Sequence, residues 1–518
     1  MDRSRLAETD RERSRARPAA TLGVIDMGSN TARFVAFETT RAGTVRAFFE
    51  AKDVPRLGSG TGDDGRLADD AIDRGVQTVR RFARIVRDLG LPRTLAVATS
   101  AVRDAPNGPD YVRRVERQTG VLLRVLSGGE EAHYGYLGVA GAWALENDLV
   151  FDLGGGSMQM IDVRAGRERN SVSLPLGVLR LTQRFLEHDP PKHRELEALR
   201  DHVRETLASV LEAFGRTAYR LHGIGGTVRS LARAAIEMRQ YPIGRVHGYP
   251  LYASEIEALA ELLGEMSAEK RRAIPGIGGD RADVVLAGIV VLEELLRATS
   301  AERIVVSGTG IREGIALEAI GAKLPASSAE LAERSTAAAA ESFSFRADHG
   351  LEVAETALAL FDLLAGRFEW GPSERLALGV AARMHDAGTA IDLWQHAVHS
   401  AYLIRNYPIW GLDQREVLLA SMIAYLHEGD DLPSDWKRGY QPIIGAAELD
   451  AARRLGVLLE LAELTAAANP RFTLGGGGRG LTVAFSALAD TALSPRWPEK
   501  IRKPMERALD LELKVREP

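Results

Sequence analysis

Short apolar runs alternate with longer amphipathic stretches along residues 22–322. The apolar runs predict buried strands, and they cover residues 22–37 (as a hairpin), 46–50, 95–100, 121–126, 151–160 (as strand, turn and strand), 221–227 and 303–307. The amphipathic stretches predict helices, at residues 69–89, 110–118, from 127 onward, 177–185, 193–214, 228–235, 281–297 and 311–320. In the first of these helices Asp69 or Asp70 can cap the start and Gly90 can end it. Strands that alternate with helices predict a layered α/β fold.

The pattern changes after residue 322. Residues 323–340 are rich in alanine and serine and contain Pro325, which predicts a linker. Beyond it almost no strand signal remains, and helical periodicity covers residues 351–364, 374–387, 398–405, 414–427 and 446–468, with a flexible loop at 475–480. In the first 20 residues arginines alternate with acids, which is typical of a disordered tail. We therefore expect a tail (1–20), two α/β domains (21–145 and 146–322), a linker (323–340) and a helical domain (341–518).

Composition narrows the possible partners and location. Of the 518 residues, 45% are hydrophobic and 26% are charged, which is ordinary for a globular protein. The net charge of −5 argues against non-specific binding to nucleic acid. There are no cysteines, which excludes disulfides, thiol catalysis and cysteine-bound metals. No apolar run approaches the roughly 18 residues of a membrane span, and the first 20 residues lack the apolar core of a signal peptide. We therefore expect a cytoplasmic protein with no membrane and no nucleic-acid partner.

One strand–turn–strand pattern occurs twice. Residues 151–160 read FDLGGGSMQM and residues 25–31 read IDMGSNT, so that Asp26 and Asp152 lie 126 residues apart (152 − 26). At this offset three further pairs correspond: Gly28 with Gly154, Thr31 with Ser157 and Arg33 with Gln159. Glycine turns expose backbone N–H groups to phosphate oxygens, and an aspartate at a strand end can hold Mg²⁺. The alternative is two exposed hairpins, but further glycine turns at 223–227 and 307–310 favour a polyphosphate site gripped from two sides.

Charged residues near these turns could carry out chemistry. Ser127 and Glu130 have the spacing of a capping box, which leaves Glu131 free to orient and deprotonate a water molecule. The alternative is that both glutamates only interact with the helix dipole. Arg33 and Arg103 are candidate phosphate ligands, because guanidinium binds phosphate oxygens bidentately; isolated arginines are otherwise solvated surface residues.

Histidines cluster in the helical region. The cluster consists of His349, His385 with Asp386, His396, His399 and His427. Such a set can hold one or two metals that activate water for phosphoester hydrolysis. The alternative is that these histidines are ordinary core or surface residues.

Eight stretches of residues 21–322 occur together in this order: VIDMGSNTARF, ATSAVRDAPN, SGGEEAHYGYLGV, VFDLGGGSMQM, SLPLGVLRLT, GIGGTVRSLA, IPGIGGDRADVVLAGIVVLEELL and VVSGTGIREG. Through these stretches, residues 21–322 resemble the exopolyphosphatase and guanosine pentaphosphate phosphatase (Ppx/GppA) family of the actin-like ATPase superfamily. The helical region resembles the HD-type domain of longer members, through MHDAGTAIDLWQHAVHSAYLI and SMIAYLHEG. The implied fold is two actin-like (ribonuclease H-like) α/β domains followed by an all-α HD-like domain.

The resemblance implies that inorganic polyphosphate, or guanosine pentaphosphate (pppGpp), binds between the first two domains and loses its terminal phosphoryl group to water. It implies Glu131 as the catalytic base and Asp152, with Asp26, as ligands of Mg²⁺, while Arg33 and Arg103 clamp the chain. The implied phosphate cradle consists of Gly28, Ser29, Asn30, Thr31, Gly154, Gly155, Gly156, Ser157, Gly225, Gly226 and Thr227. The implied metal ligands of the third domain are His349, His385, Asp386, His399 and His427. The family also leads us to expect a homodimer.

Two positions depart from the family pattern. Gln159 stands where the family usually has the glutamate of GGGS-x-E, and an amide cannot take up a proton as a carboxylate can. Residues 461–466 read LAELTA, without the aspartate expected near ADALD. The leading hypothesis is an exopolyphosphatase, and its closest rival is a pppGpp 5′-phosphatase. Two other hypotheses stay open. One is a regulator that binds these ligands with weak turnover, and the other is a phosphoester hydrolase that acts at the histidine cluster.

Overall fold

The computed structural model describes residues 20–60, 64–215, 219–429, 431–475, 480–484 and 496–516. The predicted tail, apart from Ala20, and most of the predicted loop at 475–480 lie outside these residues. The chain forms two compact units. Unit 1 consists of Met1–Gly141, Leu145–Glu237 and Pro250–Leu324, and unit 2 consists of Ala142–Ala144, Met238–Tyr249 and Pro325–Pro518. Within the described residues, no helix is both long enough and apolar enough to cross a membrane.

Unit 1 contains two sheets, of which sheet A comes first in the chain. Its strands, in spatial order, are β3 (Val45–Asp53), β2 (Ala32–Thr39), β1 (Thr21–Met27), β4 (Thr94–Ala98) and β5 (Leu123–Val125). Strands β1, β2 and β3 form an antiparallel meander, whereas β4 and β5 continue the sheet in parallel from β1. The predicted hairpin over residues 22–37 is therefore confirmed.

Sheet B repeats this arrangement. Its strands, in spatial order, are β10 (Pro250–Tyr252), β11 (Arg303–Val306), β9 (Arg220–Ile224), β6 (Asp148–Leu153), β7 (Met158–Arg164) and β8 (Arg167–Leu174). Strands β6, β7 and β8 are antiparallel neighbours, and β9 and β11 run parallel to β6, as β4 and β5 do to β1. The same order and the same directions in both sheets confirm a duplicated α/β fold, to which β10 adds an antiparallel edge.

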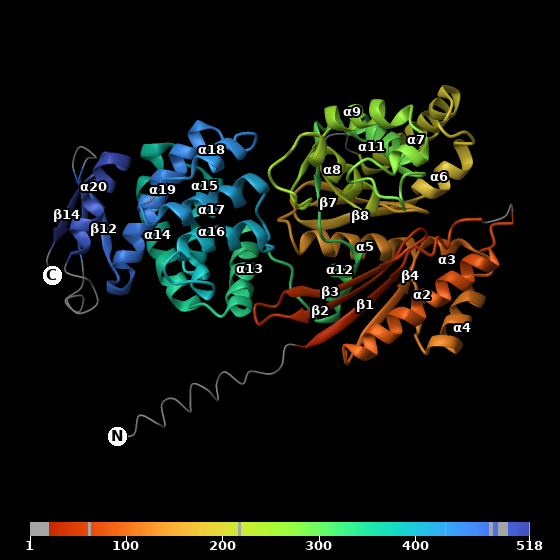
Figure 1. Ribbon diagram of the computed structural model, residues 1–518, viewed down its shortest axis with the longest axis horizontal. Helices are drawn as coiled ribbons and strands as arrows, with labels where there is room; N and C mark the ends of the chain where they lie inside the picture. Colours follow the sequence, from red (N-terminus) through yellow and green to blue (C-terminus); the bar gives the residue numbers. More distant parts are fainter. Residues whose placement is uncertain are drawn as a thin grey trace, which may run out of the picture. The chain divides into compact units, whose positions relative to one another are not determined.

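Helices cover both faces of sheet A. On one face, apolar side chains of α2 (Asp69–Asp88) and α4 (Gly108–Thr119) pack on β1 and β2. On the other face, α5 (Gly128–Ala140) and α12 (Ile311–Ala319) complete a second apolar cluster. Because α5 also contacts β6, β7 and β8, this helix pair lies between the two sheets (Figure 1). The other helices of unit 1 are α3 (Ser100–Asp104), α6 (Val178–Phe185), α7 (His193–Phe214), α8 (Gly226–Met238, which continues into unit 2), α9 (Ala253–Gly264), α10 (Ala268–Arg271) and α11 (Val285–Thr299).

Two predictions about helix N-caps in unit 1 can be compared with the structure. At α5 the predicted capping box is confirmed: the Glu130 N–H donates to Ser127 Oγ (3.2 Å), and the Ser127 N–H donates to Glu130 Oε2 (2.8 Å). At α2 the predicted side-chain cap is wrong, because Ala68 is the N-cap residue. Asp69 and Asp70 lie inside the first turn, where the positive end of the helix stabilises carboxylates.

Unit 2 is predominantly helical, as predicted. Its longer helices are α13 (Ser328–Phe343), α14 (Ala347–Phe368), α15 (Pro372–Met384), α16 (His396–Asn406), α17 (Gln414–Leu426), α19 (Ala446–Thr465) and α20 (Trp497–Leu509), and its shorter ones are η1 (Ala387–Ala390), α18 (Ser434–Gly439) and η2 (Ala466–Ala468). One continuous apolar core joins α14, α15, α17 and α19. The residues expected to form a linker are mostly helix α13, because its small side chains pack against this core.

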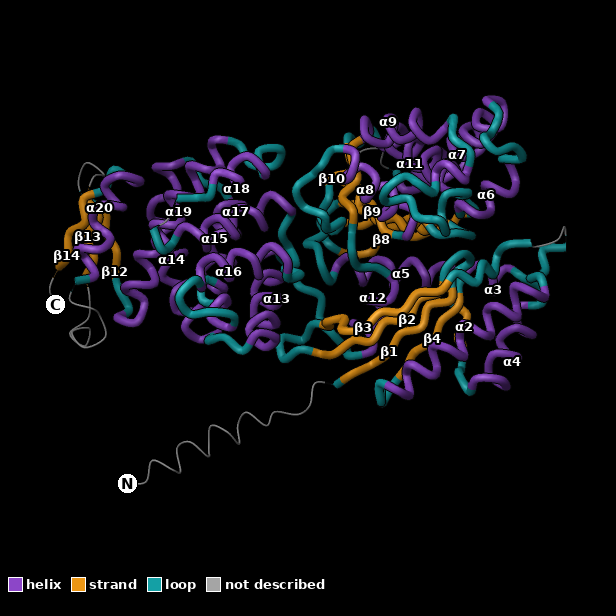
Figure 2. Tube along the Cα trace, viewed as in Figure 1, coloured by secondary structure: helices purple, strands orange, loops and turns teal. Residues whose placement is uncertain are grey.

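The prediction that this region is all-α needs a correction. A three-stranded sheet follows the helices, with β13 (Gly480–Ala484) between β12 (Arg471–Leu474) and β14 (Glu512–Arg516) (Figure 2). Leu481, Val483 and Leu513 are buried on its inner side and belong to the same apolar core. These strands are short, and β14 pairs with β13 across the intervening α20, so local periodicity alone did not reveal them.

Candidate active site

The two glycine turns have the same backbone geometry. The Gly28 N–H donates to the Thr31 carbonyl (3.1 Å), and the Gly154 N–H donates to the Ser157 carbonyl (3.0 Å). The strand registers agree as well, pairing Asp26 with Arg33 and Asp152 with Gln159. The correspondence predicted at an offset of 126 residues (152 − 26) is therefore confirmed.

The carbonyl groups of the second turn face the start of α6. The N–H groups of Val178 and Leu179 donate to the carbonyls of Gly154 (3.0 Å) and Gly155 (2.8 Å). In a trans peptide the C=O and the next N–H point in opposite directions. The N–H groups of Gly155 and Gly156 therefore point away from α6.

The first turn is oriented in the same way by the loop after β3. The N–H groups of Gly58 and Arg56 donate to the carbonyls of Ser29 (2.9 Å) and Asn30 (3.1 Å). By the same peptide geometry, the N–H groups of Asn30 and Thr31 point away from this loop. Each turn thus has its carbonyls satisfied on one side and its amides presented on the other.

Glycine allows the two turns to approach each other. A Cβ atom on Gly156 would lie 2.5 Å from the hydroxyl oxygens of both Ser29 and Ser100, and one on Gly155 would lie 3.2 Å from the backbone nitrogen of Asn30. Any side chain at Gly156 would push these hydroxyls away. The close approach of the turns therefore requires glycine at this position.

The turns form the walls of an open cleft of about 790 Å³, a volume that includes solvent at its mouth. The predicted residues that line it are Asp26, Gly28, Ser29, Asn30, Thr31, Arg33, Glu131, Asp152, Gly154, Gly155, Ser157, Gly225 and Gly226. Three other residues that were predicted to bind phosphate do not line the cleft. Arg103 binds Glu131, Gly156 packs against Ser29, and the Thr227 hydroxyl accepts a hydrogen bond from Arg281 (3.5 Å).

Asp26 and Asp152 repel each other inside the cleft. Burial raises the pKa of Asp26, and burial together with the charge of Asp26 raises the pKa of Asp152 to about 6. Gly225 lies so close that a Cβ atom there would be 2.8 Å from Asp152 Oδ1. Two crowded carboxylates with hard oxygen donors are a suitable ligand set for a divalent cation, which would offset their repulsion.

Glu131 lies in the first turn of α5, and only 6% of its surface is exposed. The Arg103 guanidinium donates to its Oε2 atom at 2.8 Å. Burial raises the pKa of Glu131 to about 7, because desolvation outweighs the opposing effect of Arg103, and the charges of Asp152 and Asp26 add to the increase. A carboxyl group with a pKa near 7 suits a general base at neutral pH.

Three arginines that the sequence analysis did not select also line the cleft: Arg229, Arg281 and Arg312. Burial and the charge of Arg312 lower the pKa of Arg229 to about 10, and the buried Nε of Arg312 has no hydrogen-bond partner among the described residues. Positive charges held in this way suit a polyanionic ligand. Each arginine lies within three residues of a glycine, but this spacing is too common along the chain to single them out.

Both arginines that were predicted to clamp phosphate already have a carboxylate partner within the protein. Arg33 lines the cleft and forms an ion pair with Glu50. Arg103 is shared between Glu131, Asp104 (3.2 Å) and the Leu126 carbonyl (3.2 Å). Arg103 is therefore placed to position Glu131, and its role as a phosphate clamp stays a prediction.

Gln159 lies behind the second turn and does not line the cleft. Its side chain is 1% exposed and donates to Ser157 Oγ (2.8 Å) and Ser173 Oγ (3.0 Å). Because Ser157 accepts this hydrogen bond, its own hydroxyl proton is free to point into the cleft. Gln159 thus orients a cradle hydroxyl, a role that the sequence did not reveal.

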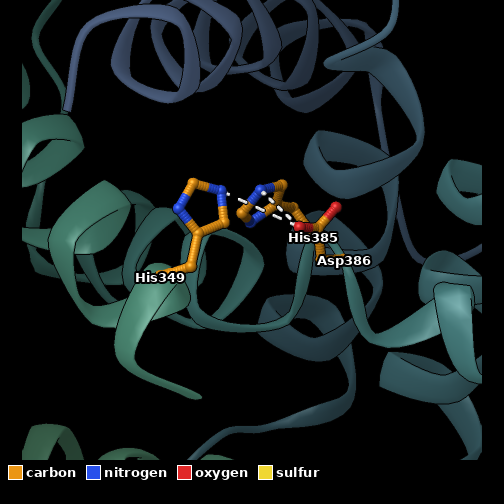
Figure 3. A group of neighbouring side chains, drawn as sticks. All are labelled: His349, His385 and Asp386. Carbon is orange, nitrogen blue, oxygen red and sulfur yellow. Dashed lines mark ion pairs between the residues drawn. The ribbon is translucent and has the colours of Figure 1, made fainter. Parts of the chain in front are cut away.

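The histidine cluster belongs to unit 2. His349 and His385 approach Asp386, with nitrogen–oxygen distances of 3.8 and 3.7 Å (Figure 3). His396 lies 3.6 Å from the same carboxylate and 3.3 Å from His427. The structure therefore places His396, and not His399, in the group. No hydrogen bond, ion pair or ring contact of the His399 side chain with this group is found among the described residues.

Fold and site together define a class of protein. The two sheets share one strand order, apart from the added edge strand β10, and each carries a glycine turn after an aspartate-bearing strand. Two such sheets whose turns line one cleft are the architecture of actin-like ATPases. Backbone amides, arginines and carboxylates in one cleft are the parts needed for phosphoryl transfer.

Comparison with known proteins gives the family. The model of the Ppx/GppA phosphatase family matches residues 37–322, and that of Ppx/GppA phosphatase domain III matches residues 331–486. The chain belongs to the Ppx/GppA phosphatase family, and it is a hydrolase. It is 34% identical over 305 residues to exopolyphosphatase 1 of Mycobacterium tuberculosis, covering 57% of this chain and 87% of that one. Exopolyphosphatase 1 of Mycobacterium leprae is 33% identical over 304 residues, covering 57% and 88%.

Solved structures agree with this assignment. An exopolyphosphatase from Cytophaga hutchinsonii is 27% identical, with a TM-score of 0.54, and covers 59% of this chain and 99% of its own. The Ppx/GppA family member of Aquifex aeolicus is 28% identical, with a TM-score of 0.51, and covers 58% and 98%.

Proposed function

We propose that the protein is an exopolyphosphatase that removes the terminal phosphate of inorganic polyphosphate by hydrolysis. The observation that carries the proposal is the pair of glycine turns that line one cleft together with Glu131. A phosphate chain has no hydrogen-bond donors when fully ionised, so N–H groups and guanidiniums are the complementary partners. The match to curated exopolyphosphatases supports the same substrate class.

Glu131 would act as the general base. Its carboxylate would accept a proton from a water molecule in line with the terminal phosphorus, while the bridging oxygen leaves with the shortened chain. Arg103 would hold the carboxylate in orientation through its contact at 2.8 Å. The amides of both turns, with Arg229, Arg281 and Arg312, would stabilise the charge on the transferred group.

Asp26 and Asp152 would hold the divalent cation, which we propose is Mg²⁺. When bound, it supplies positive charge that neutralises the oxygens of the reacting phosphoryl group. The two aspartates orient this charge toward the turns, because they sit at the ends of β1 and β6 where the turns begin.

The cleft lining favours polyphosphate over pppGpp. None of the described residues that line it is aromatic, so it offers no aromatic ring on which a guanine base could stack. A panel of long polyphosphate, short polyphosphate and pppGpp would test this preference by measuring phosphate release with and without Mg²⁺. A much higher kcat/KM for pppGpp would show that the nucleotide is the substrate.

The catalytic role of Glu131 can be tested separately. Glu131→Gln keeps the size of the side chain but cannot accept a proton, so we expect phosphate release to fall roughly 10²- to 10⁴-fold with polyphosphate binding retained. Glu130→Gln is the matched control, because Glu130 is adjacent and serves the capping box. A fully active Glu131→Gln variant would show that another group activates the water.

Gln159 favours a second candidate, a regulator that binds polyphosphate or pppGpp with weak turnover. It stands where the family glutamate is expected, and it orients Ser157 without reaching the cleft. Tight binding with negligible phosphate release by the unmodified protein would select this alternative. A cytoplasmic location and a homodimer stay predictions.

A further inference from the structure

A loop that leads into α11 is bound to the edge of sheet A by two ion pairs. Residues 278–283, the bridging loop, lie between α10 and α11. Lys52 of β3 donates to Asp280 Oδ2 (2.6 Å), and Arg56, which follows β3, donates to both oxygens of Asp283 (2.6 and 3.2 Å). The paired residues are 228 and 227 positions apart in the chain, so only the folded arrangement of unit 1 brings these charges together.

The backbone of the bridging loop is held by further hydrogen bonds. Asn30, in the first glycine turn, donates from Nδ2 to the Asp280 carbonyl (3.2 Å), and the buried Arg271 donates from Nη1 to the Ala282 carbonyl (3.0 Å). The N–H of Arg56 also donates to the Asn30 carbonyl (3.1 Å), so Arg56 contacts both the first turn and the bridging loop. The position of the loop therefore does not depend on the Asp280 side chain alone.

Arg281 is the residue of this loop that lines the cleft. Its guanidinium packs against a glycine turn, where a Cβ atom on Gly226 would lie 1.9 Å from Nη2, and Nη1 donates to Thr227 Oγ1 at 3.5 Å. A hydrogen bond of this length is weak, and a guanidinium has five N–H donors. Most of the donors of Arg281 are therefore available for an anion in the cleft.

Asp280 can compete with such an anion for Arg281. Its Oδ2 atom lies 3.9 Å from Arg281 Nε, which is too long for a hydrogen bond, and 2.6 Å from Lys52 Nζ. Burial opposes ionisation of Asp280, but the hydrogen bond and charge of Lys52 lower the pKa of Asp280 below its ordinary value. A movement of about 1 Å by this carboxylate would bring it within charge-assisted hydrogen-bond distance of Arg281.

Lys52 is placed to prevent this movement. It does not line the cleft, and its side chain is 37% exposed, a setting in which an ion pair adds little to stability. We propose that Lys52 is a positioning residue for substrate binding: by occupying Asp280, it keeps Arg281 available for a phosphate group of the substrate. This inference rests on the proposed function, because it requires a polyanionic substrate in the cleft.

The test measures kcat/KM for phosphate release from long polyphosphate, and the Kd for the same polyphosphate by filter binding, both at low salt with saturating Mg²⁺. Lys52→Met leaves the Asp280 carboxylate free to pair with Arg281, so we expect Kd to rise and kcat/KM to fall roughly fivefold or more. Asp280→Asn removes the competing charge and should leave Kd unchanged or lower it. The double variant of Lys52→Met and Asp280→Asn should match Asp280→Asn, because the second change removes the cause of the first defect.

Two further variants are controls. Lys52→Arg keeps a cation that can pair with Asp280 and should bind polyphosphate as the unmodified protein does. Arg46→Met removes another cation of β3, one that pairs with Glu38 inside sheet A (Nε–Oε1 2.6 Å), and should leave Kd unchanged.

The rival explanation is that the pair of Lys52 and Asp280 only ties the loop to sheet A. Asp280→Asn would then weaken binding as much as Lys52→Met, and this result would overturn the proposal. A double variant as defective as Lys52→Met would also overturn it, because Lys52 would then contact the substrate itself. If Lys52→Met does not fold, Asp280→Asn and the double variant still decide the question, since neither leaves a carboxylate without its partner.

Failure of the proposed function would be distinguishable from failure of this inference. If the unmodified protein binds polyphosphate without releasing phosphate, the proposed hydrolysis is wrong, and the Kd values of the variants still test the role of Lys52. If the unmodified protein does not bind polyphosphate, both proposals are overturned.

Discussion

Two adjacent glutamates at the start of α5 should change stability in opposite directions with pH. Burial raises the pKa of Glu131 from its ordinary value of 4.5 to about 7. The Ser127 backbone and hydroxyl bonds of the capping box lower the pKa of Glu130. Because one pKa unit corresponds to about 1.4 kcal/mol, ionising Glu131 in the folded cleft costs roughly 3 kcal/mol more than in the unfolded chain.

The sign follows from which state binds the proton. Below about pH 4, Glu131 is protonated in both states and has no effect. As the pH rises to about 7 the unfolded chain ionises first, so the folded state loses stability, and above that the loss is complete. Glu131→Gln carries no charge, so its stability relative to the unmodified protein should increase by roughly 3 kcal/mol between about pH 4 and pH 8. The capping-box bonds lower the pKa of Glu130, so Glu130→Gln should instead become relatively less stable as the pH rises to about 4.5, the ordinary pKa of glutamate, with no further change above it.

The assay must report on unit 1. All six tryptophans belong to unit 2, so fluorescence would miss the change. Hydrogen exchange of peptides from β1 and β6, measured by mass spectrometry in EDTA, reports on the two strands that carry the cleft carboxylates. Comparing variants at the same pH removes the intrinsic pH dependence of exchange. If Glu131→Gln gains no protection, or if both variants change in the same direction, the burial argument is wrong.

Three further substitutions test the cleft. Asp152→Asn should abolish the Mg²⁺ dependence of phosphate release, measured as rate against Mg²⁺ concentration, because it removes a cation ligand and relieves repulsion with Asp26; an unchanged profile would contradict this role. Gly156→Ala should raise the KM for polyphosphate roughly tenfold or more, since its Cβ would meet the Ser29 and Ser100 hydroxyls at 2.5 Å. Gln159→Glu replaces a donor with an acceptor and should raise KM several-fold at high pH; a higher kcat at unchanged KM would show that position 159 acts on the metal or the water.

The sequence was sufficient to predict the duplicated turns, because their geometry depends on local residues. An aspartate ending a strand, glycines in the turn and a hydroxyl at its end recur at one offset, and each has a local physical reason. The capping box at Ser127 and Glu130 was predictable for the same reason. Pairing of the turns across the cleft then followed from the topology of two equivalent sheets.

Other cleft residues could not be identified from local pattern. Whether Arg229 and Arg312 line the cleft depends on how α8 and α12 pack, and for Arg281 it depends on the turn that precedes α11. The role of Gln159 likewise depends on Ser173, which β8 brings beside it. In both cases the residues that meet are far apart along the chain: helix packing brings the arginines to the cleft, and the register of β7 and β8 brings Ser173 to Gln159.

For the histidines of unit 2, the local sequence predicts part of the arrangement, and helix packing determines the rest. His385 and His427 each follow the last residue of a helix, and each donates to the carbonyl three residues earlier, that of Ala382 or Ala424. Carbonyls at helix ends lack intrahelical partners, so a histidine at this position satisfies one and turns its second nitrogen outward as an acceptor. The Ala-x-x-His pattern at two helix ends is visible in the sequence, and it predicts imidazoles whose second nitrogen is an acceptor. The choice between His396 and His399 needs the packing of α16 against α17, because both residues lie near the same face of one helix.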